Sequence, residues 1–347
     1  MDDFLDQVCH TLAAWDVDSL ATSPPPPEEL TVELVAELRR RVREGGKRLR
    51  PIYSIWGWLA AGGQSRPQTH ALLVEIGAAL ELLHLFALVQ DDVMDRSDHR
   101  RGLPTLHLTA AEAHRRLGSL GDPVLFGDSA ATLLGDLALS EACLLVAANP
   151  APVRALWRLM TVELVHGQLY DLTHAASRDR RIEMTRAIAR LKTGRYTVTR
   201  PLQLGALVAG ADDDLALRLG AYGDLVGDAF AIRDDILGVW GDPATTGKPV
   251  GDDLRSAKPT VLLAMAAERV PESGRALMAA CNAGTLDDDG VHALRDGLAA
   301  WGVLDRAEAM IAELVTEASG LLASTPVDPQ ARAALDGLAN RVAWRCS

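Results

Sequence analysis

The sequence predicts an all-α protein, a single domain of roughly ten to thirteen helices, and three observations lead to that prediction. From Glu28 onwards, apolar residues recur at three- and four-residue spacing, as in Leu30, Leu34, Val35 and Leu38. Aromatic residues make up only 4% of the chain while Ala and Leu are abundant, which favours helix over strand. No convincing run of period-two alternation is present, so we expect no substantial sheet.

The chain divides into a short N-terminal appendage, residues 1–27, and one domain, residues 28–347. Pro24 to Pro27 break any helix and separate the two parts. No internal repeat and no second linker follows. Turn signals divide the domain into its helices at Gly62-Gly63, Gly118 to Pro123, Asn149-Pro150, Gly210 to Asp214 and Gly241 to Pro249. A helix of about twenty residues is about 30 Å long, which is enough to line a deep cavity.

Composition limits the functions to consider. The formal net charge is −12, so nucleic acid is a poor partner for the surface as a whole. Basic clusters in so acidic a chain are better suited to a small anionic ligand. The four cysteines lie far apart and form no CxxC pair, which indicates neither a disulfide framework nor a zinc site and fits a reducing cytosol.

We also expect a soluble, cytoplasmic protein without a membrane span. The N-terminus lacks the basic and apolar regions of a signal peptide. The most apolar stretch, Ala71 to Val89, is interrupted by Glu75, Glu81 and His84, so it suits a buried core helix better than a membrane span.

The first acidic cluster, Asp91, Asp92 and Asp95, ends this apolar helix. Asp91 and Asp95 share one helix face about 6 Å apart along the axis, while Asp92 points about 100° away. Mg²⁺ takes oxygen ligands and usually shares them with substrate phosphates. A polar turn with Arg100 and Arg101 follows, and arginine suits bidentate phosphate binding. The alternative is simple ion pairing at a helix C-terminus.

Two further residues lie on the Asp91 stripe of this helix. His84 is seven residues before Asp91 and Ala87 four before, so the apolar run forms one wall of a pocket with an acidic mouth. His84 on its own could equally be a satisfied core histidine.

The second acidic cluster, Asp234 and Asp235, ends the mostly apolar segment from Tyr222 to Ile232, and Gly238 stands where a third aspartate would complete a copy of the first. The loop that follows carries Lys248 but lacks the Ser or Thr of a nucleotide-binding loop. Candidate phosphate-binding residues are then Lys248, Lys258 and Lys192, which has the hydroxyl of Thr193 beside it. Each lysine alone is as compatible with a solvated surface position.

The segment from Gly45 to Pro51 combines two glycines, three cations and a proline at a helix junction. Backbone and side-chain donors together build an anion site there, including Lys47 and Arg50. The alternative interpretation is a solvated run of charge.

Five motifs in this order resemble those of the trans-prenyltransferases, the head-to-tail isoprenyl diphosphate synthases of the polyprenyl synthetase family, and most closely the bacterial geranylgeranyl diphosphate synthases. The resemblance covers about residues 40–260. It implies an isoprenoid synthase fold, a bundle around a deep central pocket. It also implies a Mg²⁺-dependent, homodimeric enzyme that condenses isopentenyl diphosphate with an allylic diphosphate to give geranylgeranyl diphosphate.

The resemblance assigns roles to individual residues. Three Mg²⁺ ions would be held by Asp91, Asp95 and Asp234, with Asp92 and Asp235 in support. The allylic diphosphate would contact Arg100, Lys192, Thr193, Lys248 and Lys258, and the isopentenyl diphosphate would contact Lys47, Arg50, His84 and Arg101. Gln168 matches a polar pocket residue. The catalytic set would be Asp91, Asp95, Arg100, Lys192, Asp234 and Lys248. Phe86 would form the floor of the pocket, and the small Ala87 would permit growth beyond fifteen carbons.

The chain departs from the family pattern in three places. Ala231 replaces a glutamine, Gly238 replaces an aspartate, and the first motif lacks a two-residue insertion that is common in bacterial short-chain enzymes. Two alternatives stay open. A class I terpene cyclase would need a second metal triad, but the spacing offers only Asp228, Ile232 and Ile236. A non-catalytic subunit would be expected to have lost one acidic cluster, and both are present.

Overall fold

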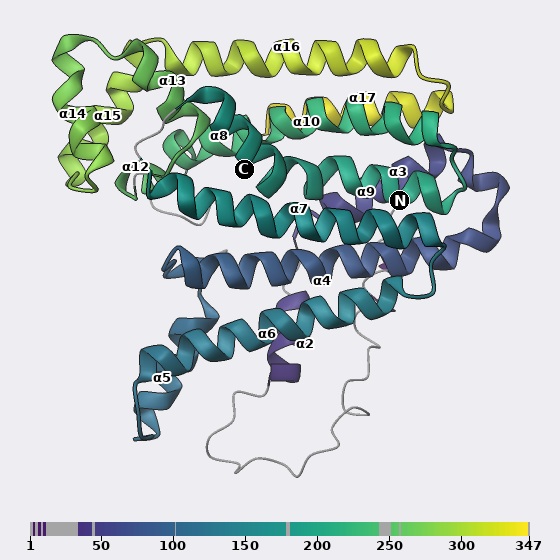
Figure 1. The fold of residues 1–347 in the computed structure, drawn as a ribbon, viewed down its shortest axis with the longest axis horizontal. Coiled ribbons are helices and arrows are strands. Elements are labelled where there is room, and N and C mark those ends of the chain that lie inside the picture. The colour runs from purple at the N-terminus through teal and green to yellow at the C-terminus, as the bar shows by residue number, and fades with distance from the viewer. Residues whose placement is uncertain are drawn as a thin grey trace.

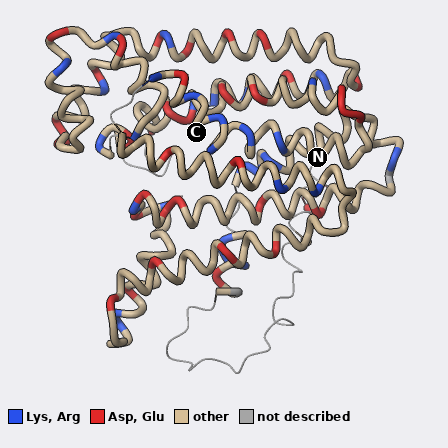
Figure 2. Tube along the Cα trace, in the orientation of Figure 1, with Lys and Arg blue, Asp and Glu red and all other residues tan. Residues whose placement is uncertain are grey.

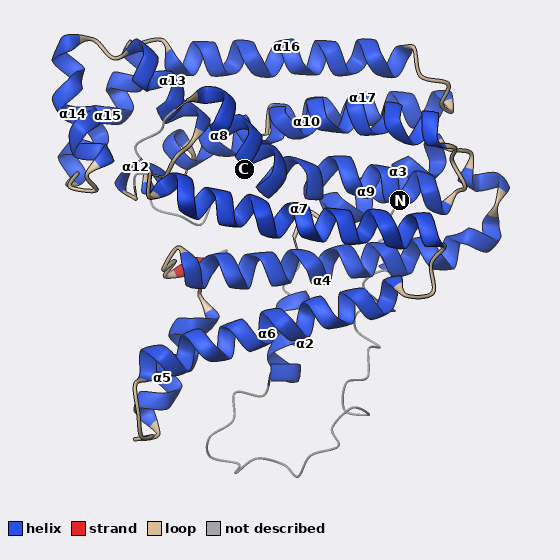
Figure 3. Ribbon diagram, in the orientation of Figure 1, coloured by secondary structure: helices blue, strands red, loops and turns tan. Residues whose placement is uncertain are grey.

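The computed structural model describes residues 34–43, 46–100, 102–177, 181–242, 251–256 and 258–345, with a few residues near the N-terminus. The described residues are almost entirely helical (Figure 3). The predicted appendage, residues 1–27, lies almost wholly outside the described residues, as does the proline run within it.

The described part of the N-terminal half of the fold is made mainly of α-helices. They are α2 (Leu34–Arg43), α3 (Leu49–Ala60), α4 (His70–Met94), α5 (Leu106–Arg116), α6 (Pro123–Val146) and α7 (Ala151–Ala175). Short 3-10 turns, η2 (Gly63–Ser65) and η3 (Pro67–Thr69), join α3 to α4. The strands β1 (His99–Arg100) and β2 (Leu103–Pro104) form a small antiparallel pair after the first acidic cluster.

The C-terminal half divides more finely. Its elements are α8 (Ile182–Ala189), the π-helix η4 (Arg190–Thr199), α9 (Arg200–Val208), α10 (Asp213–Trp240), α12 (Asp252–Arg255), α13 (Val261–Arg269), η5 (Glu272–Gly274), α14 (Arg275–Asn282), α15 (Asp288–Ala300), α16 (Val303–Ala323) and α17 (Pro329–Ala343). The all-α prediction is confirmed. The helices exceed the expected ten to thirteen because the segment from α12 to α15 is cut into short pieces.

Capping side chains fix several helix starts at the predicted turns. Asp122 accepts a hydrogen bond from the backbone N–H of Val124 at the start of α6, and Asp212 does the same for Leu215 at the start of α10. The turn signals at Gly118 to Pro123 and Gly210 to Asp214 therefore mark real helix boundaries.

Two buried apolar clusters hold the bundle together. One joins α4, α6 and α7 through residues such as Leu80, Leu83 and Met160. The other surrounds α10 with residues of α13, α16 and α17, Tyr222 and Ile311 among them. α7, α4 and α6 form successive layers below α10 and α16 (Figure 1). The ends of α4 and α10 that carry the acidic clusters face the space between these two halves.

Two helices of the described part, α4 and α6, are long and apolar enough to cross a membrane by length and composition alone. The most apolar window of α4 is 61% buried inside the fold, and that of α6 is 44% buried. The core helix of a soluble protein passes the same test, and α4 lies in the middle of the bundle (Figure 1). α6 differs because a large part of its apolar surface is uncovered.

Candidate active site

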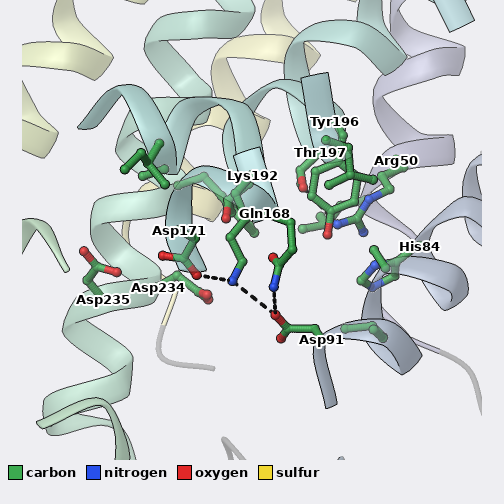
Figure 4. A pocket seen from close by; sticks show the side chains of 18 of the residues that line it. Arg50, His84, Asp91, Gln168, Asp171, Lys192, Tyr196, Thr197, Asp234 and Asp235 are labelled. Atoms are coloured by element: carbon green, nitrogen blue, oxygen red, sulfur yellow. Dashed lines mark hydrogen bonds and ion pairs between the residues drawn. The ribbon is translucent and has the colours of Figure 1, made fainter. Parts of the chain in front are cut away.

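One cavity brings together residues of both acidic clusters and most of the predicted basic residues. Its volume is about 520 Å³, within the range usual for small-molecule sites. The predicted site residues that line it are Lys47, Arg50, His84, Ala87, Asp91, Arg100, Gln168, Lys192, Thr193, Asp234, Asp235 and Lys258. They come from α3, α4, α7, η4, α10 and the segments next to them (Figure 4).

Close helix packing positions the cations in this cavity. A Cβ on Gly167 of α7 would come within 2.5 Å of the backbone nitrogen of Lys192, so only glycine allows η4 to approach α7 this closely. Gly194 of η4 and Gly227 of α10 meet in the same way, with a Cβ on either lying 3.0 Å from the other's backbone. These contacts hold the π-helix η4 close against both α7 and α10. π-Helical segments are frequent at functional sites.

Asp91 is the best-connected carboxylate of the first cluster. It accepts hydrogen bonds from Gln168 Nε2 and Arg100 Nη2, both at 3.4 Å, and Lys192 Nζ lies 3.1 Å away (Figure 4). Burial raises the pKa of Asp91, but Lys192, Lys258 and Arg100 together outweigh burial and hold that pKa well below its usual range. Asp91 is therefore an anion that a ring of cations keeps ionised.

The other two aspartates of this cluster behave differently from one another. Asp95 is exposed at the mouth and lies 3.1 Å from Lys258 Nζ. Asp92 is buried, points away from the cavity and accepts a hydrogen bond from Arg100 Nε at 2.9 Å. Burial raises the pKa of Asp92 although Arg100 opposes that shift. Asp92 is not among the described lining residues of the cavity, and its hydrogen bond orients Arg100.

Lys192 and Lys258 form the cationic centre of the cavity. Lys192 Nζ donates to Asp171 Oδ2 at 2.6 Å and also faces Asp91. Burial and the charge of Lys258 lower the pKa of Lys192, but Asp91 and Asp171 reverse the shift. The pKa of Lys258 is likewise raised, because Asp253, Asp91 and Asp95 outweigh its burial. Both lysines stay charged where a phosphate would need them.

A second basic wall is built around Arg50. Its guanidinium lies 4.2 Å from the centre of the Tyr196 ring, and Nη2 donates to Thr197 Oγ1 at 2.9 Å. The ring of His84 lies 6.2 Å from that of Tyr196. Arg50 is 7% exposed, and among the described residues its Nε has no hydrogen-bond partner, which leaves a donor for an anion. Lys47 is exposed at the edge of this wall.

The second acidic cluster faces the first across the cavity (Figure 4). Asp234 accepts from Arg345 Nη2 at 2.5 Å, and that guanidinium also lies 4.0 Å from the centre of the Phe230 ring. Asp235 is partly buried and accepts the backbone N–H of Val261 at 2.8 Å. Burial and the charge of Asp253 raise the pKa of Asp235 well above its usual value.

The glycine that interrupts the second motif has a structural counterpart. A Cβ on Gly238 would lie 2.1 Å from Asp253 Oδ2, so the carboxylate of Asp253 fills the space beside Gly238. Asp253 also lines the cavity.

The donor set fits Mg²⁺. Asp91 and Asp95 on α4 and Asp234 on α10 supply hard oxygen atoms, and every one of them already lies beside a cation. Among the described residues, no three metal-binding side chains are close enough to hold an ion alone. A metal here would share its coordination with another oxygen-rich group.

The remaining predicted residues have mixed outcomes. Ala87 lines the cavity, but Phe86 is not among its described lining residues and packs against the apolar cluster of α4, α6 and α7. Arg101 and Lys248 lie outside the described residues. Asp228, weighed as part of a cyclase triad, is bound by Arg186 and Arg190 at 3.1 and 2.9 Å.

Sequence reasoning missed several residues of the cavity: Asp171, Tyr196, Thr197, Asp253 and Arg345. Asp171 had a local signal, because it follows Gln168 by three residues on the same face of α7. Arg345 had none, since its partner Asp234 is 111 residues away in sequence.

Comparison with known proteins agrees with the geometry. The model of the polyprenyl synthetase family matches residues 32–296. A geranylfarnesyl diphosphate synthase of Aeropyrum pernix is 32% identical over 314 residues, covering 88% of this chain and 92% of that protein. A (2E,6E)-farnesyl diphosphate synthase of Mycobacterium tuberculosis is 32% identical over 309 residues, covering 86% of this chain and 80% of that protein.

A solved structure is similar over nearly the whole fold. It is a geranylgeranyl pyrophosphate synthase from Corynebacterium glutamicum, complexed with isoprenyl diphosphate and magnesium, with a TM-score of 0.91 and 35% identity over 99% of this chain and 98% of that chain. Together with the family match, this similarity shows that the chain belongs to the polyprenyl synthetase family of trans-isoprenyl diphosphate synthases and is a prenyl-transferring enzyme.

Proposed function

We propose that the protein condenses isopentenyl diphosphate with an allylic diphosphate and that its main product is geranylgeranyl diphosphate. The observation that carries this proposal is a single cavity in which two carboxylate clusters and two separate basic walls meet. Each basic wall can bind one diphosphate. The allylic diphosphate would lie beside Lys192 and Lys258, and isopentenyl diphosphate would lie beside Arg50. Similar proteins include farnesyl, geranylgeranyl, geranylfarnesyl and nonaprenyl diphosphate synthases, so the product length is the finer part of the proposal.

The allylic diphosphate binds where Lys192, Lys258 and Arg100 now face Asp91 and Asp95. Binding exchanges carboxylate–cation pairs for phosphate–cation pairs, and unit charges 4 Å apart interact by about 4 kcal/mol at an effective dielectric constant near 20. Bound Mg²⁺, proposed at three ions per active site, would supply positive charge that stabilises the leaving diphosphate. Asp91, Asp95 and Asp234 would hold these ions, with Asp235 in support.

The chain's own residues then direct the chemistry. The allylic C–O bond breaks and its electron pair leaves with the diphosphate, which the cations hold. Ala87, Leu88 and Leu164 give the reacting carbon an apolar surrounding that excludes water. Arg50, Lys47 and His84 hold isopentenyl diphosphate so that its double bond attacks the allylic cation. The new C–C bond forms, and a proton passes to the departing diphosphate, which restores a double bond.

A second copy of this chain is the proposed partner. Exposed apolar residues recur along one side of α7 and along α6, and a continuous apolar stripe on long helices is typical of a protein interface. They are Leu159, Val162, Val165, Leu169 and Leu172 on α7, and Leu125, Leu133 and Leu144 on α6. A homodimer in the cytoplasm covers both stripes and accounts for the half-exposed apolar surface of α6 without a membrane.

The test is incubation with isopentenyl diphosphate, an allylic diphosphate and Mg²⁺, followed by phosphatase treatment and mass analysis of the alcohol. A twenty-carbon prenyl alcohol supports the proposal. A hydrocarbon product would identify a terpene cyclase, which the pairing of Asp228 with two arginines argues against. Absence of any product with all three allylic primers of five, ten and fifteen carbons would indicate a non-catalytic subunit.

A further inference from the structure

On the α7 side the cavity ends at a defined level, whereas on α4 its lining continues back to His84 and Glu81, beside Arg48 and Arg50. The two helices run in the same direction (Figure 1), and the hydrogen bond of 3.4 Å from Gln168 Nε2 to Asp91 Oδ1 sets their register near the mouth. Four residues before each of these, Ala87 and Leu164 both line the cavity. No described residue of α7 before Leu164 lines it.

The next level down is closed by apolar side chains. Four residues further back lie Leu83 on α4 and Met160 on α7, about 12 Å along the axes from the level of Asp91 and Gln168. Both are 0% exposed, and both belong to the same buried cluster as Leu164. On an ideal helix, Met160 points within about 40° of Leu164, so it stands below the last lining residue of α7.

Phe86 is badly placed for the same task. An ideal helix puts it about 140° from Asp91, and the structure leaves it outside the described lining of the cavity. Its side chain packs against the apolar cluster instead. Residues of α4 and α7 one level beyond Ala87 and Leu164 are therefore better placed than Phe86 to form the floor of the cavity.

We propose that Met160, with Leu83 opposite, forms the floor of the reaction cavity and sets the length at which the prenyl chain stops growing. This inference rests on the proposed condensation of isopentenyl units. Methionine is unbranched and fills irregular gaps in apolar cores, so it closes the space between α4 and α7 without polar groups. A short prenyl tail fits beside Ala87 and Leu164. As the tail grows, its end reaches the level of Met160 and Leu83.

Met160→Ala tests the assignment. Removing most of this side chain opens space in line with the cavity, which a longer apolar tail fills. We expect the main product to move from twenty carbons to twenty-five or more. We also expect geranylgeranyl diphosphate, offered as the allylic substrate, to be extended about ten- to a hundredfold faster than by the wild-type protein. Met160→Phe fills the same space and should shift products to fifteen carbons.

Arg158→Ala is the matched control, because Arg158 lies two residues before Met160 on α7, is exposed and should leave product length unchanged. Leu83→Ala repeats the test from the opposite wall if Met160→Ala fails to fold, as judged by circular dichroism. Unchanged products in Met160→Ala and Leu83→Ala, with longer products in Phe86→Ala, would overturn the assignment. If the wild-type protein makes no prenyl diphosphate at all, it is the proposed function that fails.

Discussion

The charged side chains in and beside the cavity form ion pairs with one another. Lys192 faces Asp91 and Asp171, Lys258 faces Asp95, and Arg345 faces Asp234. A buried charge without a partner costs several kcal/mol, so the fold tolerates these groups only as pairs. The same pairing lowers the pKa of Asp91 and raises the pKa values of Lys192 and Lys258, so these three groups stay ionised. Segments with Lys and Arg lie near segments with Asp and Glu in the middle of the fold (Figure 2).

Asp95→Ala should lower turnover by about three orders of magnitude without unfolding the protein. Asp95 is exposed at the mouth, so its removal takes away metal-held charge and little packing. Steady-state turnover at saturating Mg²⁺ and the melting temperature measure the two effects. Asp98→Ala is the control, since Asp98 is also exposed but lies in the turn that follows α4. Near-normal turnover in Asp95→Ala would contradict the metal assignment.

Arg345→Ala should tighten divalent-metal binding in the absence of substrate by about two- to fivefold, the worth of a partly exposed ion pair. Arg345 forms an ion pair with Asp234, whose side chain is 63% exposed. A metal that binds Asp234 must therefore displace the Arg345 guanidinium. Titration calorimetry or the electron paramagnetic resonance of Mn²⁺ measures the affinity. Arg341→Ala, a change on the helix that precedes Arg345, is the comparison. Equal or weaker Mn²⁺ binding in Arg345→Ala would show that the pair does not compete with the metal.

At the scale of single elements, the π-helix η4 is the part of the fold on which the site depends most. It supplies Lys192, Thr193, Tyr196 and Thr197, and it is held between α7 and α10 by glycine contacts. Ion pairs reinforce that position, because Arg195 reaches Glu163 of α7 at 2.6 Å and Asp224 of α10 at 3.2 Å. A shift of η4 would therefore move both basic walls at once.

Gly167→Ala should destabilise the protein by about 1–3 kcal/mol and raise the KM for the allylic substrate, because the new methyl group displaces the backbone at Lys192. Gly320→Ala is a matched control, since an added methyl group at Gly320 of α16 would meet no atom within 4 Å. That change should be neutral or stabilise by about 0.5–1 kcal/mol. Chemical denaturation and initial rates decide the outcome. Equal stability changes in both variants would mean that the helix contact is not tight.

The parts of this site that sequence could predict are those with a local spacing. Asp91 and Asp95 share a helix face because they are four residues apart, and that follows without any tertiary information. Arg345 forms an ion pair with Asp234, which is 111 residues away in sequence, and no local sequence pattern predicts such a contact. The π-helix was also missed, since it arises from packing against α7 and α10 and not from propensity. Phe86 was assigned from family behaviour, and helix geometry alone already placed it away from the Asp91 stripe.

At the scale of the whole molecule, the bundle leaves apolar stripes on α6 and α7 uncovered. Leu133 is 55% exposed near the middle of α6, and Leu125 and Leu144 flank it at 65% each. None of these three residues lines the cavity. A dimer formed through this face would bury the stripes and leave both active sites accessible.

Leu133→Glu should convert the proposed dimer to a monomer or raise its dissociation constant by about tenfold or more, since a charge buried at an interface is unfavourable. Light scattering coupled to gel filtration measures the mass. Leu217→Glu is the control, because Leu217 is 70% exposed on α10 and lies outside the two stripes. A wild-type protein that is already monomeric at high concentration would contradict the proposed partner.

Counting the isopentenyl units added to different primers tests the central proposal most directly. The protein is incubated with labelled isopentenyl diphosphate and either dimethylallyl or farnesyl diphosphate, and the products are separated by mass. A cavity that stops growth at one level predicts a twenty-carbon product from both primers, with three units added to the first and one to the second. Products whose length depends on the primer, or that stop at fifteen carbons, would contradict geranylgeranyl diphosphate as the main product. Failure to incorporate any label would contradict the condensation itself.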